Sequence, residues 1–366
     1  MTAHDKLLFT PGPLTLSLSV KLAMLHDAGS WHNDFNGLVA SLREQLLALS
    51  GLSRENGWEA VLMQGSGTFA VESVFQTCVP NSGKVAVLAN GAYGERIVQM
   101  LAAARIPHVA LRCAEDTVPD PAALAALLAS DGAITHVAMV HCETTTGILN
   151  PIETIGPLAK AHGKIFIVDA MSTFAALPID FAECGIDLLV SSANKCLEGA
   201  PGIGFVIGRR GVLLANEGGA RSLSLDVAAQ LRGFEKDGKF RFTPPTHILL
   251  ALAQAMRELE AEGGLCARLQ RYRANHNLLV SGMRRLGFQP YLRPEVQGPI
   301  ITSFLYPHDK FDFTALYNAL SERGFIIYPG KLTQANTFRI GNIGWIYPAD
   351  IEQLLAAIEN VIWPVP

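Results

Sequence analysis

The stretch DLLVSSANKCLEGAPGIGFVIG (residues 187–208) holds two short apolar runs with a single lysine between them. The runs at 187–194 and 202–208 are typical of buried strands, because each is short, mostly apolar and bounded by small residues or glycine. Lys195 follows the first run directly. Lysine side chains lie mostly on solvated surfaces, so a surface lysine at a strand end is the simpler interpretation. A reactive amine in a crevice at the end of the sheet is the alternative.

Strand-like and helix-like segments alternate upstream of this stretch, from about residue 60. This alternation predicts an α/β fold, in which a mostly parallel sheet carries helices on both faces. We expect a sheet of seven strands in a large domain. Besides the two runs above, strands are predicted at 61–65, 84–90, 108–113, 135–142 and 164–170, and helices at 68–79, 95–104, 121–130 and 151–163.

The chain changes character after a long helical pattern at 248–263. This pattern ends in two glycines, which are a common stop signal for a helix. The segments that follow, such as RLGFQPYL and TALYNALSERG, indicate a compact α+β unit. We therefore expect a large domain over 15–264 and a smaller α+β domain that combines 1–14 with 265–366.

Composition and charge narrow the class of protein. The 366 residues are 49% hydrophobic and 17% charged, so the chain can bury a sizeable core. A net charge of −4 gives no global basic field, which argues against nucleic acid as a partner. We expect no signal peptide and no membrane span, because no apolar run approaches the roughly 20 residues that a span needs. The six cysteines form no CxxC pair, so we expect reduced thiols, no metal site and a cytoplasmic location.

The turn GSGT (65–68) follows a predicted strand and opens a predicted helix. The backbone amides of Gly67 and Thr68, with the hydroxyls of Ser66 and Thr68, would meet at the positive end of that helix. Such a helix end binds phosphate well. The turn is neither a Walker A loop nor a GxGxxG motif, so it supports a nucleotide only weakly. An ordinary N-capped helix is the alternative interpretation.

Asp169 ends the apolar run KIFIVD, and Lys195 comes 26 residues later, also just past a strand. In open α/β sheets the carboxyl ends of the strands face the ligand crevice. One crossover fits between the two residues, so both should lie at the same edge of the sheet as GSGT. A carboxylate after an apolar strand needs a partner, and a protonated pyridine nitrogen would serve. Capping of the next turn is the alternative role for Asp169.

Together, a phosphate-binding turn, a pyridinium partner and an imine-forming lysine are what pyridoxal 5'-phosphate requires of a protein. Tyr93, in NGAYGER (90–96), follows a strand at a place where its ring could stack on this cofactor. The segment HCETTTG (141–147) offers Thr144 and Thr145 at another strand end, where a hydroxyl could reach the cofactor ring. Each of these segments is also compatible with a purely structural turn.

Arg339, in NTFRIGNIG, lies far downstream in the predicted small domain. Arginine binds a carboxylate or a phosphonate through two parallel hydrogen bonds. A substrate anion held by Arg339 across the domain cleft would orient the substrate amine toward the cofactor. A surface arginine is the alternative interpretation.

The motifs resemble those of the fold-type I, pyridoxal-phosphate-dependent aminotransferases of class V, and the resemblance extends over nearly the whole chain. The combination of SSANKC, GSGTFAVE and GSWxxDFN is specific within this class. The similar segments are LLFTPGPLT (7–15), GSWHNDFN (29–36), MQGSGTFAVES (63–73), NGAYGER (90–96), HCETTTGILNP (141–151), IVDAMSTF (167–174), SSANKCLEG (191–199), FRFTPPTH (240–247) and FRIGNIG (338–344).

The resemblance implies catalytic roles for two residues. Lys195 would form the Schiff base with the cofactor, and Asp169 would hold the pyridine nitrogen. Thr243, in FTPPTH, would reach the cofactor phosphate from the neighbouring subunit, so the resemblance implies a homodimer with shared active sites. The other implied contacts are with the phosphate (Ser66, Gly67 and Thr68), with the cofactor ring (Tyr93) and with the substrate anion (Arg339).

The reaction that the resemblance implies is transfer of the amino group of 2-aminoethylphosphonate to pyruvate, as a step of phosphonate catabolism. The products would be phosphonoacetaldehyde and L-alanine. The alternative is a serine/alanine–glyoxylate type of aminotransferase in the same class, which would share the cofactor residues. A dinucleotide-dependent oxidoreductase would need a GxGxxG turn, which the sequence lacks.

Overall fold

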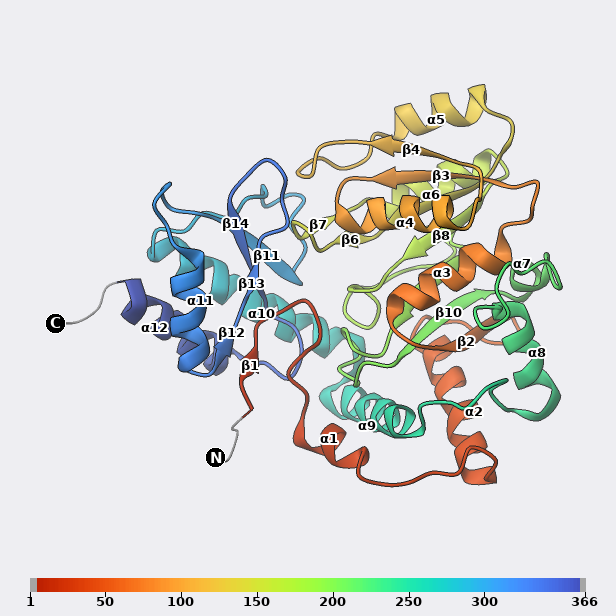
Figure 1. The fold of residues 1–366 in the computed structure, drawn as a ribbon, viewed down its shortest axis with the longest axis horizontal. Coiled ribbons are helices and arrows are strands. Elements are labelled where there is room, and N and C mark those ends of the chain that lie inside the picture. Colours follow the sequence, from red (N-terminus) through yellow and green to blue (C-terminus); the bar gives the residue numbers. More distant parts are fainter. Residues whose placement is uncertain (1–4, 363–366) are drawn as a thin grey trace.

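The structure is a computed structural model that describes residues 5–362. All seven predicted strands are present and form one sheet (Figure 1). Their bounds are β2 (Trp58–Gln64), β3 (Lys84–Ala89), β4 (His108–Arg112), β5 (Ile134–Val140), β8 (Ile165–Asp169), β9 (Leu188–Ser192) and β10 (Ile203–Arg209). The strand order is β2-β10-β9-β8-β5-β3-β4. Only β10 runs antiparallel to its neighbours in this sheet, so the prediction of a mostly parallel sheet in an α/β fold is confirmed.

The predicted helices occupy the connections between these strands, as parallel strands require. They are α3 (Gly67–Cys78), α4 (Ala92–Ala103), α5 (Pro121–Ser130), α6 (Ile152–Ala161) and, after the sheet, α9 (Thr246–Glu262). Four further helices of this part of the chain have no counterpart in the sequence-based prediction. They are α1 (Leu18–Ala23), α2 (Asn33–Ala48), α7 (Arg210–Leu214) and α8 (Val227–Asp237).

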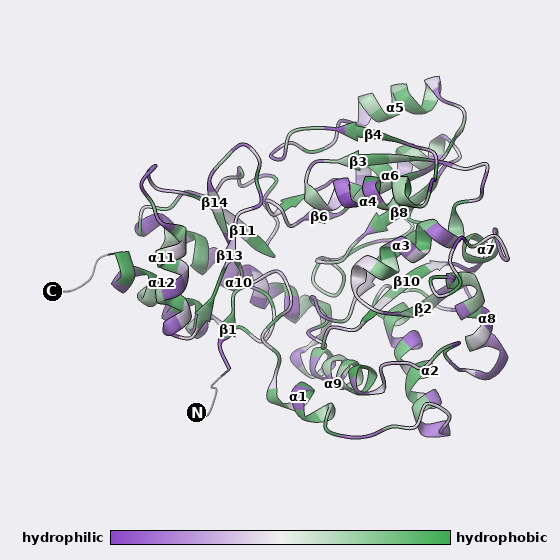
Figure 2. Cartoon of the chain, in the orientation of Figure 1, coloured by the Kyte–Doolittle hydropathy of each residue, from purple (hydrophilic) through white to green (hydrophobic). Residues whose placement is uncertain are grey.

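The central strands are buried on both faces, which explains why they appear in the sequence as continuous apolar runs. Along β5, the side chains from Val137 to Val140 are at most 4% exposed. Figure 2 shows hydrophobic residues along the sheet and hydrophilic residues on the outer surfaces of the surrounding helices. The main hydrophobic core therefore lies on the two sides of the seven-stranded sheet.

The C-terminal part of the chain builds a second, smaller hydrophobic core. The N-terminal segment joins it, because β1 (Leu7–Leu8) pairs in parallel with β12 (Phe325–Ile326) and the fully buried Phe9 belongs to this core. This part of the chain also contains a three-stranded antiparallel sheet, in the strand order β11-β14-β13. The remaining elements are α10 (Gly264–Arg285), β11 (Ile301–Leu305), α11 (Phe313–Glu322), β13 (Tyr328–Pro329), β14 (Thr337–Gly341) and α12 (Pro348–Ile362).

Helix α10 connects the two cores (Figure 1). Tyr272, in its first half, belongs to the core of the large sheet, whereas Leu279 and Met283, in its second half, belong to the smaller core. The division of the chain into 15–264 and 1–14 plus 265–366 stays a prediction. Residues 1–4 and 363–366 of the predicted small domain lie outside the described residues.

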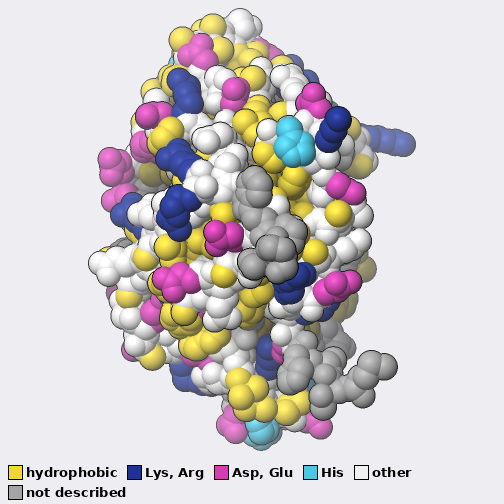
Figure 3. Space-filling view, turned by 90° about the vertical axis from the view of Figure 1, so that its left-hand side faces the viewer, with side chains coloured by type: hydrophobic (Ala, Val, Ile, Leu, Met, Phe, Trp, Pro, Cys, Tyr) yellow, Lys and Arg dark blue, Asp and Glu magenta, His cyan; other side chains and the backbone are white. Residues whose placement is uncertain are grey.

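The surface carries charges of both signs. Figure 3 shows acidic and basic side chains interspersed on the face at the small-core end of the molecule. Among the helices within residues 5–362, none combines the length and the apolar character that crossing a membrane demands.

Candidate active site

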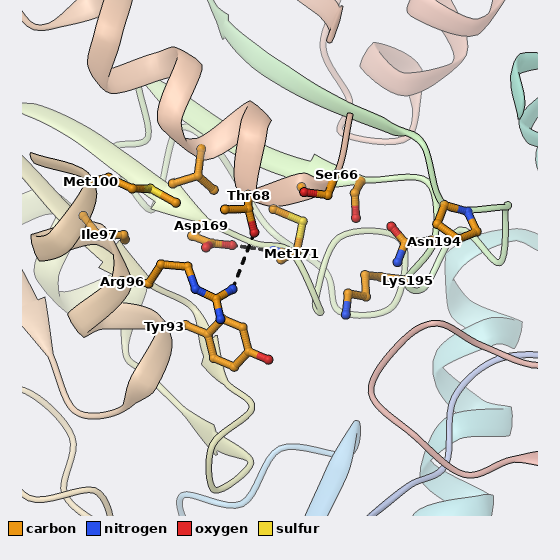
Figure 4. A pocket seen from close by; sticks show the side chains of 14 residues that line it. Ser66, Thr68, Tyr93, Arg96, Ile97, Met100, Asp169, Met171, Asn194 and Lys195 are labelled. Carbon is orange, nitrogen blue, oxygen red and sulfur yellow. Dashed lines mark hydrogen bonds between the residues drawn. The ribbon is translucent and has the colours of Figure 1, made fainter. Parts of the chain in front are cut away.

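A pocket with about 680 Å³ of empty space lies at the carboxyl ends of the parallel strands (Figure 4). Its lining comes from four places: the turn after β2, helix α4, the end of β8 and the loop after β9. Residues more than 120 positions apart in the sequence therefore meet at one sheet edge, as the topology predicts. Of the residues proposed from the sequence, the structure brings Ser66, Gly67, Thr68, Tyr93, Asp169 and Lys195 together in this lining.

The GSGT turn forms the start of helix α3. Ser66 is the N-cap residue, but its side chain makes no capping hydrogen bond, so its hydroxyl is available to a ligand. A side chain at Gly67 would collide with Met171, since a Cβ atom there would lie 2.2 Å from the Met171 sulfur. The Ser192 Oγ, also in the pocket lining, is buried and has no hydrogen-bond partner within residues 5–362. These groups fit a phosphate at a helix N-terminus.

Asp169 occupies the last position of β8 and is 8% exposed. Its Oδ1 accepts a hydrogen bond from the backbone N–H of Met171, at 3.0 Å. Burial raises the pKa of the Asp169 carboxyl to about 6. A buried carboxylate with one backbone donor is poorly compensated, and a cationic ring nitrogen would restore its ionised form.

Lys195 lies in the loop after β9, and the N-terminal segment covers it. Its Nζ donates a hydrogen bond to the carbonyl oxygen of Pro11, at 2.8 Å. The backbone approaches so closely that a Cβ atom on Gly12 would lie 2.5 Å from the Lys195 Nζ. Burial lowers the pKa of the Lys195 amine. A desolvated amine with a lowered pKa is suited to nucleophilic attack and to proton transfer.

Tyr93 projects from the first turn of α4, and Arg96 lies against its ring in Figure 4. The Arg96 guanidinium carbon is 4.7 Å from the ring centroid, and Arg96 Nη1 is 3.5 Å from the Thr68 hydroxyl. Arg96 lines the pocket, yet the sequence analysis does not assign it a role. The available signal is its position three residues after Tyr93, which places both on one helix face.

Thr144 and Thr145 do not line the pocket with Lys195. The Thr145 hydroxyl donates to Glu143 Oε1 at 2.6 Å and accepts a hydrogen bond from the Ala92 N–H at 2.9 Å. Glu143 in turn accepts hydrogen bonds from the N–H groups of Tyr93 and Gly94. This cluster caps the N-terminus of α4. A contact of either threonine with a cofactor stays a prediction.

Arg339, on β14, is a buried cation that is 1% exposed. It donates from Nε to the Pro329 carbonyl at 3.0 Å and from Nη1 to the Thr144 carbonyl at 2.9 Å. No acidic side chain within residues 5–362 forms an ion pair with it, and burial lowers its pKa. A buried charge without a counter-ion is costly. The arrangement therefore favours an anionic ligand beside Arg339.

Thr243 lies apart from this pocket. It is exposed, in a hollow that Trp31 and Phe242 also line. Trp31 and Phe242 are themselves 79% and 46% exposed. Within one chain, the structure does not bring Thr243 to the residues around Lys195.

A buried ionic cluster supports the loop that carries Lys195, and sequence reasoning missed it. Arg268, on α10, donates from Nη1 to the Cys196 carbonyl and from Nε to Glu262, at 2.5 and 2.6 Å. Arg271, one turn later, donates to Glu198 at 2.7 Å and also to Glu262. Arg268 is 1% and Glu198 3% exposed. Two arginines three residues apart on a helix are a common pattern, so this spacing does not predict such a cluster.

Comparison with known proteins places the chain in a family. The family model described as "Aminotransferase class-V" matches residues 30–341, and the chain belongs to this family. The chain is 51% identical to the 2-aminoethylphosphonate–pyruvate transaminases of Klebsiella pneumoniae and Salmonella typhimurium. In both comparisons the alignment covers 99% of this chain and 99% of the relative.

Solved structures agree with the fold. Ureidoglycine–glyoxylate aminotransferase from Bacillus subtilis is similar with a TM-score of 0.90, at 23% identity, over 99% of this chain and 94% of that one. Alanine–glyoxylate aminotransferase from Nostoc also has a TM-score of 0.90, at 24% identity, over 99% and 96% of the two chains. The expected class V aminotransferase fold is therefore confirmed.

Proposed function

We propose that the chain is a pyridoxal-phosphate-dependent transaminase that converts 2-aminoethylphosphonate and pyruvate to phosphonoacetaldehyde and L-alanine, a step of phosphonate catabolism. Relatives that share 51% of its residues over nearly the whole chain are named for this pair of substrates. The observation that carries the proposal is the convergence of Lys195 and Asp169 in one pocket. Their pKa values are moved in opposite directions by the same cause, which is burial.

The pocket residues fit the cofactor by their chemistry. Ser66, Gly67 and Thr68 would hold its phosphate at the start of α3, where amides and unused hydroxyls meet. Asp169 would pair with the protonated ring nitrogen, and Tyr93 would lie against the ring. When bound, pyridoxal phosphate supplies a ring system that delocalises the electron pair released when a C–H bond breaks beside the amine.

Lys195 performs the proton transfers in this proposal. Its amine is held at the pocket by the Pro11 carbonyl, and burial lowers its pKa, which favours the neutral amine that can accept a proton. It would remove the proton from the amino-bearing carbon of the donor and would hold that proton for its return. Asp169, as a carboxylate, would stabilise a positive charge at the ring nitrogen of the bound cofactor.

Arg339 binds the anionic group of each substrate in turn. It accepts a phosphonate in the first half-reaction and the carboxylate of pyruvate in the second, which is why a single buried cation serves two substrates. The donor product leaves before pyruvate enters, so the kinetics are ping-pong. Intersecting lines in double-reciprocal plots would contradict this scheme.

The same proposal includes a cytoplasmic homodimer with shared active sites. Large apolar side chains that are exposed in one chain support the proposed dimer, because contiguous apolar surface marks interaction sites. Thr243, in the hollow beside Trp31 and Phe242, would reach the cofactor phosphate of the partner subunit. The other strongly exposed apolar side chains in the large-domain part are Leu18, Leu22, Leu25, Phe69 and Leu223.

The test is a set of half-reactions followed by visible absorption. The purified protein, loaded with pyridoxal phosphate, is mixed with 2-aminoethylphosphonate, L-alanine or L-serine in the absence of any keto acid. We expect the phosphonate and L-alanine to convert the absorption band of the lysine-bound cofactor to that of the amine form within one turnover. Lys195→Ala is the control, since it cannot form the lysine-bound band.

Each other outcome has a defined meaning. Conversion by L-serine or L-alanine but not by the phosphonate would replace the proposed donor and place the enzyme with the glyoxylate-type aminotransferases. A protein that acquires no lysine-bound absorption band at all would contradict the role of Lys195.

A further inference from the structure

The two substrates of the proposed function differ in the charge of the group that Arg339 would bind. A phosphonate, like a phosphate monoester, carries a charge of about −1.5 to −2 at pH 7, whereas a carboxylate carries only −1. Arg339 offers a single positive charge and already donates two hydrogen bonds to backbone carbonyls. A second cation beside Arg339 would complete the neutralisation of a phosphonate, and would not be needed for a carboxylate.

The loop between β13 and β14 places such a cation beside Tyr93, a residue of the pocket lining. Lys331 Nζ lies 5.2 Å from the centroid of the Tyr93 ring, which lines the pocket with Lys195. Arg339 reaches the same region, since it follows this loop on β14 and pairs in register with Tyr328 on β13. Burial raises the pKa of the Tyr93 hydroxyl. The charges of Lys331, Lys195 and Arg339 outweigh this effect and hold that pKa below its ordinary value.

Hydrogen bonds to the large-sheet part of the chain hold the loop that carries Lys331 in place. Both the backbone N–H and the hydroxyl of Thr333 donate to Glu115 Oε2, at 3.3 Å each. Glu115 follows β4 of the large sheet, so this contact holds the Lys331 loop of the smaller core against the large domain. Among ion pairs within residues 5–362, none involves Lys331, so its ammonium is not neutralised by a neighbouring acid.

We propose that Lys331 is a substrate-binding residue that supplies the second positive charge for the phosphonate group and thereby favours the aminophosphonate over amino-acid donors. The inference rests on the proposed function. An ammonium suits this role because it acts as a point charge toward a phosphonate oxygen. Arg339 alone then binds the carboxylates of pyruvate and L-alanine.

The test compares two donors in the same variants. Lys331→Gln removes the charge at nearly constant size, Lys331→Arg retains it, and Lys310→Gln removes another exposed lysine of the small-domain part. The measured quantity is kcat/KM for 2-aminoethylphosphonate with pyruvate, and for L-alanine with phosphonoacetaldehyde in reverse. We expect Lys331→Gln to lower the value for the phosphonate about tenfold, as loss of one charge-assisted contact predicts. The value for L-alanine should change less than about twofold.

Lys331→Arg should recover most of the phosphonate activity, and Lys310→Gln should match the wild type for both donors. An equal loss for both donors, or no loss for the phosphonate, would overturn the role of Lys331 while leaving the proposed function intact. A wild-type protein that turns over L-alanine with an aldehyde or keto acid but does not turn over 2-aminoethylphosphonate would overturn both the role of Lys331 and the proposed function. The thermal midpoint and the bound-cofactor spectrum of each variant show that the comparison is made between folded, loaded proteins.

Discussion

At the scale of single residues, burial makes Asp169 and Lys195 reactive. The same desolvation raises the pKa of the acid and lowers that of the amine, so both lie nearer to neutral pH than their ordinary values. Perturbed groups of this kind cluster at functional sites, and their cost appears as lost stability in the protein without its cofactor.

Replacing Asp169 with Asn should stabilise the cofactor-free protein at pH 8. The pKa of Asp169 is about 6 in the folded state against an ordinary 3.8, so the folded state binds the additional proton between these pH values. The ionised carboxylate therefore destabilises the fold above pH 6, by about 3 kcal/mol for two pKa units, and this effect disappears below about pH 4. Urea unfolding of both proteins at several pH values measures the difference.

Asp131→Asn is the control, and it should have the opposite sign. Asp131 is a partly exposed acid whose pKa is lowered by the hydrogen bond from Lys84, so its ionised form contributes stability above its ordinary pKa. A gain for Asp169→Asn that persists at pH 4, or no gain at pH 8, would contradict the assignment of desolvation as the cause.

Gly12→Ala should displace Lys195. Gly12 has φ of +126°, and a Cβ atom would lie 2.5 Å from the lysine amine. Gly51→Ala is a matched control, because Gly51 also has a positive φ but no atom within 4 Å of the added Cβ. Both should lose about 1–2 kcal/mol of stability from the backbone conformation. Only Gly12→Ala should also lower kcat, by about tenfold for each 1.36 kcal/mol that the displacement of Lys195 adds to the activation free energy. Equal activities of the two variants would contradict the close approach of Gly12 to Lys195.

At the scale of elements, helix α10 supports the loop after β9. Arg268 and Arg271 reach from α10 to Glu198 and to the Cys196 carbonyl, immediately after Lys195. Arg271 also donates to the carbonyls of Gly344 and Ile346, beyond β14. One helix thus connects the lysine loop with the strand that carries Arg339.

Arg268→Met should destabilise the protein by about 3–5 kcal/mol, because it leaves buried Glu198 and partly buried Glu262 with fewer counter-charges. It should also alter the absorption of the bound cofactor, since the Cys196 carbonyl adjoins Lys195. Denaturant unfolding and visible spectra measure the two effects. Arg257→Met on α9 is the control, since Arg257 is exposed and, within residues 5–362, its side chain donates hydrogen bonds to Gln254 alone. Equal stabilities of the two variants would contradict a supporting role for the cluster.

At the scale of the whole molecule, the residues proposed for the site are not all gathered in one pocket of one chain. The pocket around Lys195 is built by the large sheet, but the buried cation Arg339 comes from the smaller core and Thr243 lies outside. Phe242 and Trp31 are exposed beside Thr243, and the cationic groups of Arg241 and Lys239 lie over their rings. A second copy that covers this surface would bring its Thr243 to the first copy's phosphate site.

Phe242→Glu should therefore weaken self-association and activity together. Wild-type protein should sediment at about twice the chain mass of 39.4 kDa. A carboxylate in place of an aromatic side chain that the interface buries should raise the dissociation constant roughly 100-fold or more, and activity should fall on dilution as dimers separate. Lys310→Gln, which changes the net charge by the same amount, is the control. A wild-type protein that is monomeric and fully active would overturn the shared site.

The sequence alone was enough to predict the sheet and one edge of the site. Continuous apolar runs report strands buried on both faces, and parallel topology sends their carboxyl ends to one edge, so Asp169, Lys195 and GSGT could be brought together without coordinates. Class V membership followed from motifs distributed along the chain.

The contacts between distant segments could be known only from the folded structure. The sequence does not reveal that Pro11 holds Lys195, that Arg268 supports its loop, that Thr145 is occupied by Glu143, or that Lys331 lies over Tyr93. Each of these contacts joins residues from different elements through loop geometry and side-chain length. Hydrophobic periodicity carries no information on either, because it records which face of an element is buried and not which partner it meets.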